Sequence, residues 1–151
     1  MPRRMTENER QEFLAEPRIG VLSVASDDGR LPLTGPIWYG YEPGGNVTFF
    51  TGTQGRRARK TGLIRRANVL SLCVQREEFP YRYVTVEGTV IGAERPPSAE
   101  RMLAVARRYL PEEAAQAFVE AELEHSPSEL VLFEVRPDRW LTFDFTEDDE
   151  R

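Results

Sequence analysis

Residues 47–60 read Val47-Thr48-Phe49-Phe50-Thr51-Gly52-Thr53-Gln54-Gly55-Arg56-Arg57-Ala58-Arg59-Lys60, a strand-forming run followed by a glycine-containing turn and a basic segment. The pattern predicts a short strand that leads directly into the first turn of a helix. The hydroxyl groups of Thr51 and Thr53 and the free backbone N–H groups near Gly55 would then lie at the positive end of the helix dipole. The stretch therefore predicts an anion cradle that holds a phosphate between Gly55 and Lys60, with arginine side chains closing on its oxygens.

Positive charge is concentrated in this part of a chain that is acidic overall. The net charge is −5 at pH 7, yet no acidic residue lies between Glu42 and Glu77. The basic residues of that window are Arg56, Arg57, Arg59, Lys60, Arg65, Arg66 and Arg76. Such segregation favours a site for a small, multiply charged anion. A nucleic-acid binder would need a broader basic surface with exposed aromatic side chains, so we expect no nucleic-acid partner.

Length and composition predict one globular domain over residues 1–151. The chain has 151 residues, of which 40% are hydrophobic, enough for a single core and too few for a second substantial domain. No apolar run approaches the ~20 residues that span a bilayer. The charged start of the chain, Met1 to Thr6, lacks the apolar centre of a signal peptide. We therefore expect a cytoplasmic protein that does not enter a membrane.

The two residue types that most often build metal sites occur once each. Cys73 stands in an apolar run and is expected to be a buried, unreactive thiol. His125 lies in a polar, acidic segment and is expected to be a solvated histidine rather than part of a catalytic triad. With one cysteine and one histidine, zinc sites of the usual type are excluded, and we expect no metal.

Strand patterns dominate the chain. They occupy residues 19–26, 31–41, 47–51, 69–76, 83–92, 130–137 and 140–145, with a turn expected at Asp138-Arg139. Two prolines and two glycines interrupt the second of these segments. Helices are expected after the capping box at Thr6, in the basic segment up to Asn68, and over residues 99–110 and 112–124. The apolar positions at helical spacing in the last two, which include Tyr109 and Phe118, are expected to be core.

About six strands joined mostly by tight turns predict a mainly β, α+β fold, a six-stranded antiparallel split β-barrel with flanking helices. A doubly wound parallel sheet fits poorly, because strands and helices do not alternate regularly. No G-x-G-x-x-G motif follows the first strand either.

Two segments carry a family resemblance, Thr51-Gly52-Thr53-Gln54-Gly55-Arg56-Arg57-Ala58 and Tyr81-Arg82-Tyr83-Val84-Thr85-Val86-Glu87-Gly88. With the order of the strands, they resemble the pyridoxamine 5'-phosphate oxidase-like, flavin-binding split-barrel superfamily. More narrowly, the chain resembles the actinobacterial branch of flavin- and deazaflavin-dependent reductases. The likeness extends from about Ile19 to Phe143.

The resemblance implies a homodimer with cofactor sites at the subunit interface, each built by both chains. It places Pro36, Ile37 and Trp38 along the cofactor ring system, with Phe50 and Thr51 beside it. It implies that Arg56, Arg57 and Lys60, next to Gly55, take the phosphate. Tyr83 would reach in from the other subunit. Trp140 would border the site.

The chain departs from the oxidase proper in one respect. That enzyme carries a C-terminal Arg-x-His pair for its pyridoxal substrate, whereas no histidine follows His125 here. We therefore do not expect oxidation of pyridoxamine phosphate. The resemblance implies an oxidoreductase that uses coenzyme F420 or FMN to transfer a hydride to or from a small organic substrate, with the hydride chemistry supplied by the cofactor.

The choice of cofactor depends on the additional basic residues. F420 carries a phosphodiester and an oligoglutamate tail, so Arg59, Arg65, Arg66 and Arg76 favour it over FMN. The alternative is that these four residues form the solvated face of a helix in an arginine-rich chain. A non-catalytic flavin or haem carrier is the second functional class, with His125 as the only imidazole available to haem.

Overall fold

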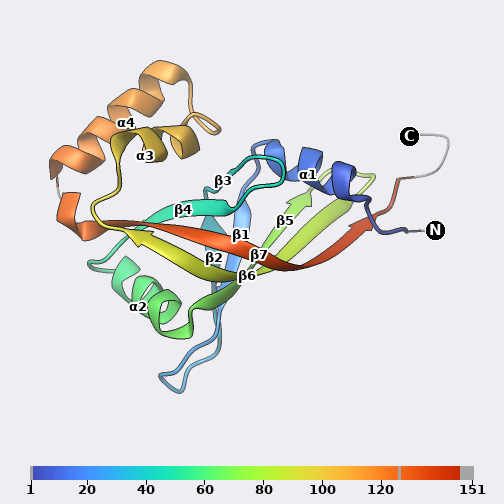
Figure 1. The fold of residues 1–151 in the computed structure, drawn as a ribbon, viewed down its shortest axis with the longest axis horizontal. Coiled ribbons are helices and arrows are strands. Elements are labelled where there is room, and N and C mark those ends of the chain that lie inside the picture. The colour runs from blue at the N-terminus through green and yellow to red at the C-terminus, as the bar shows by residue number, and fades with distance from the viewer. Residues whose placement is uncertain (1, 126, 147–151) are drawn as a thin grey trace.

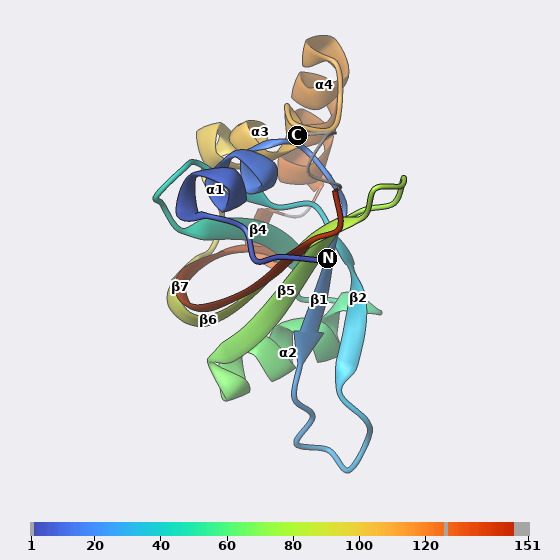
Figure 2. The ribbon, with the colours of Figure 1, turned by 90° about the vertical axis from the view of Figure 1, so that its right-hand side faces the viewer.

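A curled antiparallel sheet dominates the computed structural model, which describes residues 2–125 and 127–146 (Figures 1 and 2). In this part of the chain the sheet has seven strands in the order β2-β1-β5-β6-β7-β4-β3. The strands are β1 (Gly20–Val24), β2 (Leu33–Ile37), β3 (Gly40–Tyr41), β4 (Val47–Gly52), β5 (Val69–Arg76), β6 (Arg82–Glu94) and β7 (Leu130–Asp144). The predicted α+β class with a curled antiparallel sheet is confirmed.

The sheet has seven strands where about six were expected, and the strand boundaries differ from the expected ones in two places. The segment expected at 31–41 divides into β2 and the two-residue β3, because the chain leaves the ladder at Trp38 and Tyr39. The turn expected at Asp138-Arg139 is absent, and β7 continues through it as one strand.

A β-bulge replaces that turn. Glu87 pairs with Arg139 and Gly88 with Pro137, so Asp138 is the extra residue on β7. The bulge requires glycine on the facing strand, because a Cβ at Gly88 would lie only 2.5 Å from Val135 Cγ1.

The described helices flank the sheet. They are α1 (Glu7–Ala15), α2 (Arg57–Ala67), α3 (Ala99–Ala106) and α4 (Glu112–His125), with a 3₁₀ turn η1 (Pro127–Glu129). The capping box predicted at Thr6 begins α1, and Asn68, at φ 60°, ends α2 as predicted. The third helix is shorter than the expected 99–110 and stops at Ala106. None of these helices is long and apolar enough to cross a bilayer.

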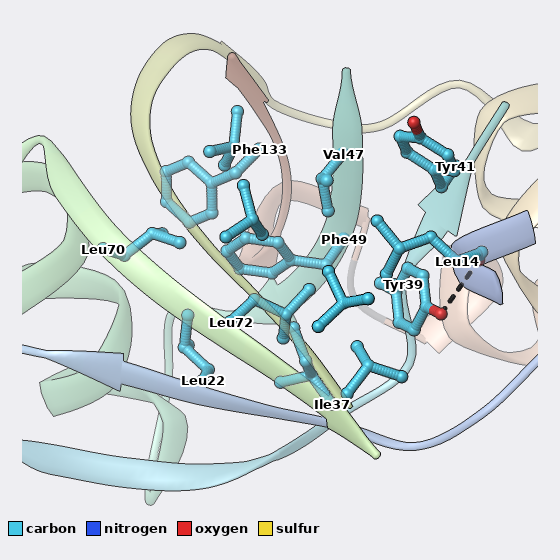
Figure 3. Packing of buried hydrophobic residues seen from close by; sticks show 14 of the residues in the cluster. Leu14, Leu22, Ile37, Tyr39, Tyr41, Val47, Phe49, Leu70, Leu72 and Phe133 are labelled. Atoms are coloured by element: carbon cyan, nitrogen blue, oxygen red, sulfur yellow. Dashed lines mark hydrogen bonds between the residues drawn. The ribbon is translucent and has the colours of Figure 1, made fainter. Parts of the chain in front are cut away.

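The main hydrophobic core fills the inside of the curl (Figure 3). Phe49 of β4 and Phe133 of β7 are fully buried there, with ring centroids 5.5 Å apart. Leu14 connects α1 to this core, and its carbonyl accepts a hydrogen bond of 2.9 Å from the buried Tyr39 hydroxyl, drawn dashed in Figure 3. This core holds β4, and therefore the start of α2, in a defined position.

Two segments lie outside the main core and frame the candidate site. The pair α3–α4 packs on a smaller cluster, with Met102, Ala106, Ala115, Val119 and Leu130 buried in it. The turn between β1 and β2 projects beside α2, as both ribbon views show (Figures 1 and 2). These placements bring α4 to one side of α2 and an acidic turn to another.

Candidate functional site

The connection from β4 to α2 has the predicted strand-to-helix geometry. Gly55 adopts φ +62°, a left-handed conformation that favours glycine. Arg56 occupies the N-cap position without a side-chain capping bond. The backbone N–H groups of Arg57 and Ala58 donate instead to the carbonyls of Gln54 and Gly55, at 3.3 and 3.2 Å. A Cβ at Gly52 would lie 2.7 Å from Arg57 Cδ. The missing side chain at Gly52 therefore allows Arg57 to lie directly across the end of β4.

A pocket of about 340 Å³ opens beside this connection, and we call it the aromatic lobe. Its lining residues are Pro36, Ile37, Trp38, Phe50, Thr51, Arg57, Lys60 and Phe118. Seven of these eight were singled out from the sequence as cofactor-binding residues, and the structure brings those seven together. They come from β2 and the residue that follows it, Trp38, from β4 and from α2.

Two cations of the first turn of α2 face this pocket. Among the described residues, neither Arg57 nor Lys60 has an ion pair. Lys60 is partly buried, and burial lowers the pKa of its amine, an effect that the neighbouring charge of Arg57 increases. A partly desolvated cation beside a second cation is unfavourable unless an anion joins them.

The hydroxyl of Thr51 is a second unsatisfied group in the aromatic lobe. Only 3% of the residue is exposed, and its Oγ1 atom has no hydrogen-bond partner within the described chain. Buried hydroxyls are nearly always paired, so an unpaired one that lines a pocket indicates a ligand atom. An aromatic wall, two cations and a free hydroxyl fit a ring system that carries a phosphate.

The aromatic wall is built by contacts that span the chain. Trp38 stacks on Tyr109 at a centroid distance of 5.0 Å and an interplanar angle of 6°, and lies 5.5 Å from Phe118. The hydroxyl of Tyr109 donates to the Arg18 carbonyl at 2.7 Å and accepts from the backbone N–H of Tyr39 at 3.1 Å. Trp38 therefore contacts two other rings, and its stacking partner Tyr109 is fixed by hydrogen bonds to the backbone.

Tyr109 and Phe118 were expected from the sequence to be ordinary core residues. Both are only partly buried, and Phe118 lines the aromatic lobe. Their helical spacing indicates one apolar face but does not say what that face covers. Tyr109 and Phe118 are the only aromatic residues in the sequence from Ala99 to His125, so no local signal marked them as parts of a site.

A second pocket, of about 470 Å³, lies on the other side of Arg57, and we call it the polar lobe. Its lining residues are Gly52, Gln54, Arg56, Arg57, Ala121, Glu122, His125, Glu129 and Leu130. Arg56 therefore faces a different pocket from Lys60, although both were expected at one phosphate. Arg57 lines both lobes.

The remaining two predicted site residues lie elsewhere in the chain. Tyr83 is on the outer side of the sheet, where its ring lies 5.8 Å from that of Phe143. Trp140 packs against the main core, and the guanidinium of Arg10 lies over its ring at 4.1 Å. Neither residue lines the aromatic or the polar lobe of its own chain.

The additional arginines do not form one free basic surface. Arg59 donates to Asp28 at 2.9 Å, and Arg66 donates to Asp27 at 3.1 Å through Nη2. The bond to Arg59 lowers the pKa of Asp28 to about 2. Both aspartates belong to the β1–β2 turn, outside the window that lacks acidic residues in the sequence. The expected cluster of free charges is wrong for these two arginines.

The other two additional arginines are far apart. Arg76 ends β5, seven residues from Val69 at the start of that strand, a span of about 23 Å at 3.3 Å per residue. Arg65 lies in the last turn of α2, where it is exposed. Of the four, Arg65 is therefore the one that remains near α2 without an ion pair in the described residues.

The sequence pattern of the family described as "Pyridoxamine 5'-phosphate oxidase" matches residues 6–144. Among solved structures, the chain is similar to one named F420 reductase, with 24% identity and a TM-score of 0.67, over 87% of this chain and 94% of that one. It is also similar to conserved hypothetical protein Rv2991 from Mycobacterium tuberculosis, with 21% identity and a TM-score of 0.69, over 93% and 86% of the two chains.

A third similar structure is a FAD-binding protein from Mesorhizobium loti, with 18% identity and a TM-score of 0.61, over 95% of this chain and 96% of that one. At these identities the similarity concerns the fold. No curated protein matches the chain.

Proposed function

The chain belongs to the pyridoxamine 5'-phosphate oxidase family, and from this premise we propose that it is an oxidoreductase that binds FMN or coenzyme F420 in the aromatic lobe. The ring system would lie along Pro36, Ile37 and Trp38. The phosphate would lie at Arg57 and Lys60, and the substrate would be a small organic molecule that exchanges a hydride with the ring. Similarity to structures named F420 reductase and FAD-binding protein supports a flavin-type cofactor.

The observation that carries this proposal is the set of unsatisfied groups in one pocket. Lys60 and Arg57 lack an acidic partner among the described residues, and the buried Thr51 hydroxyl lacks any partner there. A phosphate would neutralise the two cations through charge-assisted hydrogen bonds. A polar atom of the ring system would pair with Thr51.

The lining of the aromatic lobe also limits what the protein itself contributes. Its titratable side chains are Arg57 and Lys60, so the lobe provides no carboxylate or imidazole as a general base. When bound, the flavin or deazaflavin supplies the hydride chemistry. Trp38 and Phe118 would orient the ring and exclude water, while the two cations fix the phosphate.

Oxidation of pyridoxamine phosphate is not part of this proposal. The aromatic lobe contains no histidine, and the one histidine of the chain, His125, lines the polar lobe. The family description therefore identifies the fold of this chain and supports a flavin-type cofactor, but it does not identify the substrate.

We also propose that a second copy of the chain covers the outer side of the sheet and closes the aromatic lobe. One row across five strands places Pro36, Val21, Cys73, Thr85 and Leu141 side by side. Val21 and Leu141 are 38% and 42% exposed. The next row adds Tyr83 and Phe143. An exposed apolar face of this kind is typical of a protein interface.

Because Pro36 lies both in this row and in the wall of the aromatic lobe, a partner on the face would reach the cofactor. Sedimentation at micromolar concentration is expected to give about twice the 17.3 kDa chain mass. A monomer that binds cofactor with full affinity would contradict the shared site.

The choice between the two cofactors is tested by titration. The absorbance spectrum of the purified protein shows whether a flavin or deazaflavin is bound, and titrations with FMN and with F420 measure the two affinities. We expect saturable binding of at least one of them, with quenching of the Trp38 fluorescence by the ring bound beside it. Absence of binding to both would refute the proposed function.

A further inference from the structure

One face of α4 lines both lobes. Phe118 belongs to the aromatic lobe, whereas Ala121, Glu122 and His125 belong to the polar lobe. These residues are spaced by three, four and seven positions, so they share one side of the helix. Since Arg57 also lines both pockets, the two lobes are neighbours that share Arg57 and one side of α4.

The polar lobe contains charges of both signs. Arg56 and Arg57 come from the start of α2, while Glu122 comes from α4 and Glu129 from η1. In the part of the chain that the structure describes, none of these four side chains forms an ion pair. Both glutamates are partly buried. The carboxylates therefore face the lobe with unused hydrogen-bond acceptors.

We propose that the polar lobe binds a ribose attached to the cofactor beyond its first phosphate, as in a dinucleotide flavin. This inference rests on the proposed function, because it requires the phosphate to lie at Arg57. Arg56 and Arg57 would hold a diphosphate, and the ribose hydroxyls would donate to Glu122 and Glu129. A carboxylate that accepts from a ribose diol is a common feature of dinucleotide sites.

The same charges disfavour an oligoglutamate tail. Glu122 and Glu129 would repel its carboxylates at close range. The nearby Arg59 and Arg66, which could have attracted such a tail, are already paired with Asp28 and Asp27. The charges of the polar lobe therefore suit a group that donates hydroxyl hydrogens. A polyanion would be attracted only by the arginines on the α2 side of the lobe.

The first experiment compares ligands on the full 151-residue chain by calorimetry. FAD is expected to bind at least about tenfold more tightly than FMN, since even one additional hydrogen bond to a carboxylate adds roughly ten- to a hundredfold in affinity. ADP, which has no ring, is expected to bind about tenfold more tightly than 2′,3′-dideoxy-ADP. Equal affinities within both pairs would overturn the inference.

The second experiment uses Glu122→Ala combined with Glu129→Ala. The affinities for FAD and ADP are expected to fall about tenfold, because the ribose hydroxyls lose their acceptors. The affinity for FMN should stay unchanged or rise, because negative charge is removed from the lobe. The matched control is Glu120→Ala, an exposed glutamate of the same helix that does not line the lobe. If the double variant changes the affinities for FMN, FAD and ADP by the same factor in the same direction, the carboxylates do not bind the ribose.

The two proposals fail in different ways. If FMN binds and FAD binds no more tightly, the polar-lobe inference fails and the proposed function stands. If neither FMN nor F420 binds, the proposed function fails, and the ADP pair still decides whether the polar lobe recognises a ribose.

Discussion

The basic side chains of α2 form two groups that differ in what they contact. At its start, Arg57 and Lys60 face a pocket and have no acidic partner in the described residues. Arg59 and Arg66 are seven positions apart and share another side of the helix, where Asp28 and Asp27 of the β1–β2 turn hold them. The same helix thus carries two cations that are available to a ligand and two that are occupied.

This difference shows that the number of basic residues in a segment does not measure its capacity to bind anions. A surface ion pair contributes little to stability, about 0 to 1 kcal/mol, but it removes an arginine from competition for a ligand. An unpaired cation next to a buried hydroxyl that has no partner indicates an anion site more strongly than the number of basic residues does. The predictions below test the contrast between these two groups of side chains.

The largest effect is expected for Arg57→Ala. The change removes a charge-assisted hydrogen bond worth about 1.5–3 kcal/mol, so cofactor affinity should fall roughly ten- to a hundredfold. Fluorescence titration with FMN and F420 measures it. The matched control is Arg59→Ala on the same helix, which should leave both affinities within about twofold. If Arg57→Ala leaves both affinities unchanged, the phosphate of the cofactor does not bind at this turn.

Thr51→Val is expected to have an intermediate effect. Valine preserves the shape of the side chain but removes the hydroxyl that has no partner in the described chain. Cofactor affinity should fall about five- to tenfold, whereas the cofactor-free protein should gain on the order of 1 kcal/mol in its free energy of unfolding. Titration and urea denaturation measure the two quantities. Loss of stability in the cofactor-free variant would show that the hydroxyl is already satisfied within the protein.

A smaller effect is expected for Arg66→Gln on F420 binding. Because Arg66 is paired with Asp27, its removal should change the affinity and its salt dependence by no more than about twofold. Arg65→Gln removes the neighbouring exposed arginine and should reduce the salt dependence more. Salt titrations of both variants provide the comparison. A larger effect of Arg66→Gln would mean that its ion pair opens for the ligand.

The smallest effect concerns acid stability. The hydrogen bond from Arg59 lowers the pKa of Asp28 from 3.8 to about 2. The pair therefore stabilises the folded protein above pH 4. That contribution should disappear as the pH falls from about 4 to about 2. The difference in denaturation midpoint between the unmodified protein and Arg59→Gln should be constant above pH 4 and shrink below it. A difference that grows in acid would have the wrong sign for this pair.

Local sequence signals predicted the boundaries that local interactions set. The capping box at Thr6 and the left-handed end of α2 at Asn68 involve only neighbouring residues, and both were found from the sequence. The turn expected at Asp138-Arg139 was wrong, because the bulge opposite Gly88 depends on a strand that lies about fifty residues away. Turn chemistry alone cannot distinguish a chain reversal from a bulge that a partner strand accommodates.

The sequence by itself determined the antiparallel α+β fold, the strand-to-helix turn at Gly55 and the identity of seven residues that line the aromatic lobe. It could do so because strand alternation, glycine geometry and the family pattern are properties of short segments. Only the tertiary structure decided which cations are free, which residues of α4 line each lobe, and that Arg57 lines both lobes. Those facts depend on pairs such as Arg59 with Asp28 and Trp38 with Tyr109, whose members are separated by 31 and 71 positions and are joined only by the packing of the sheet.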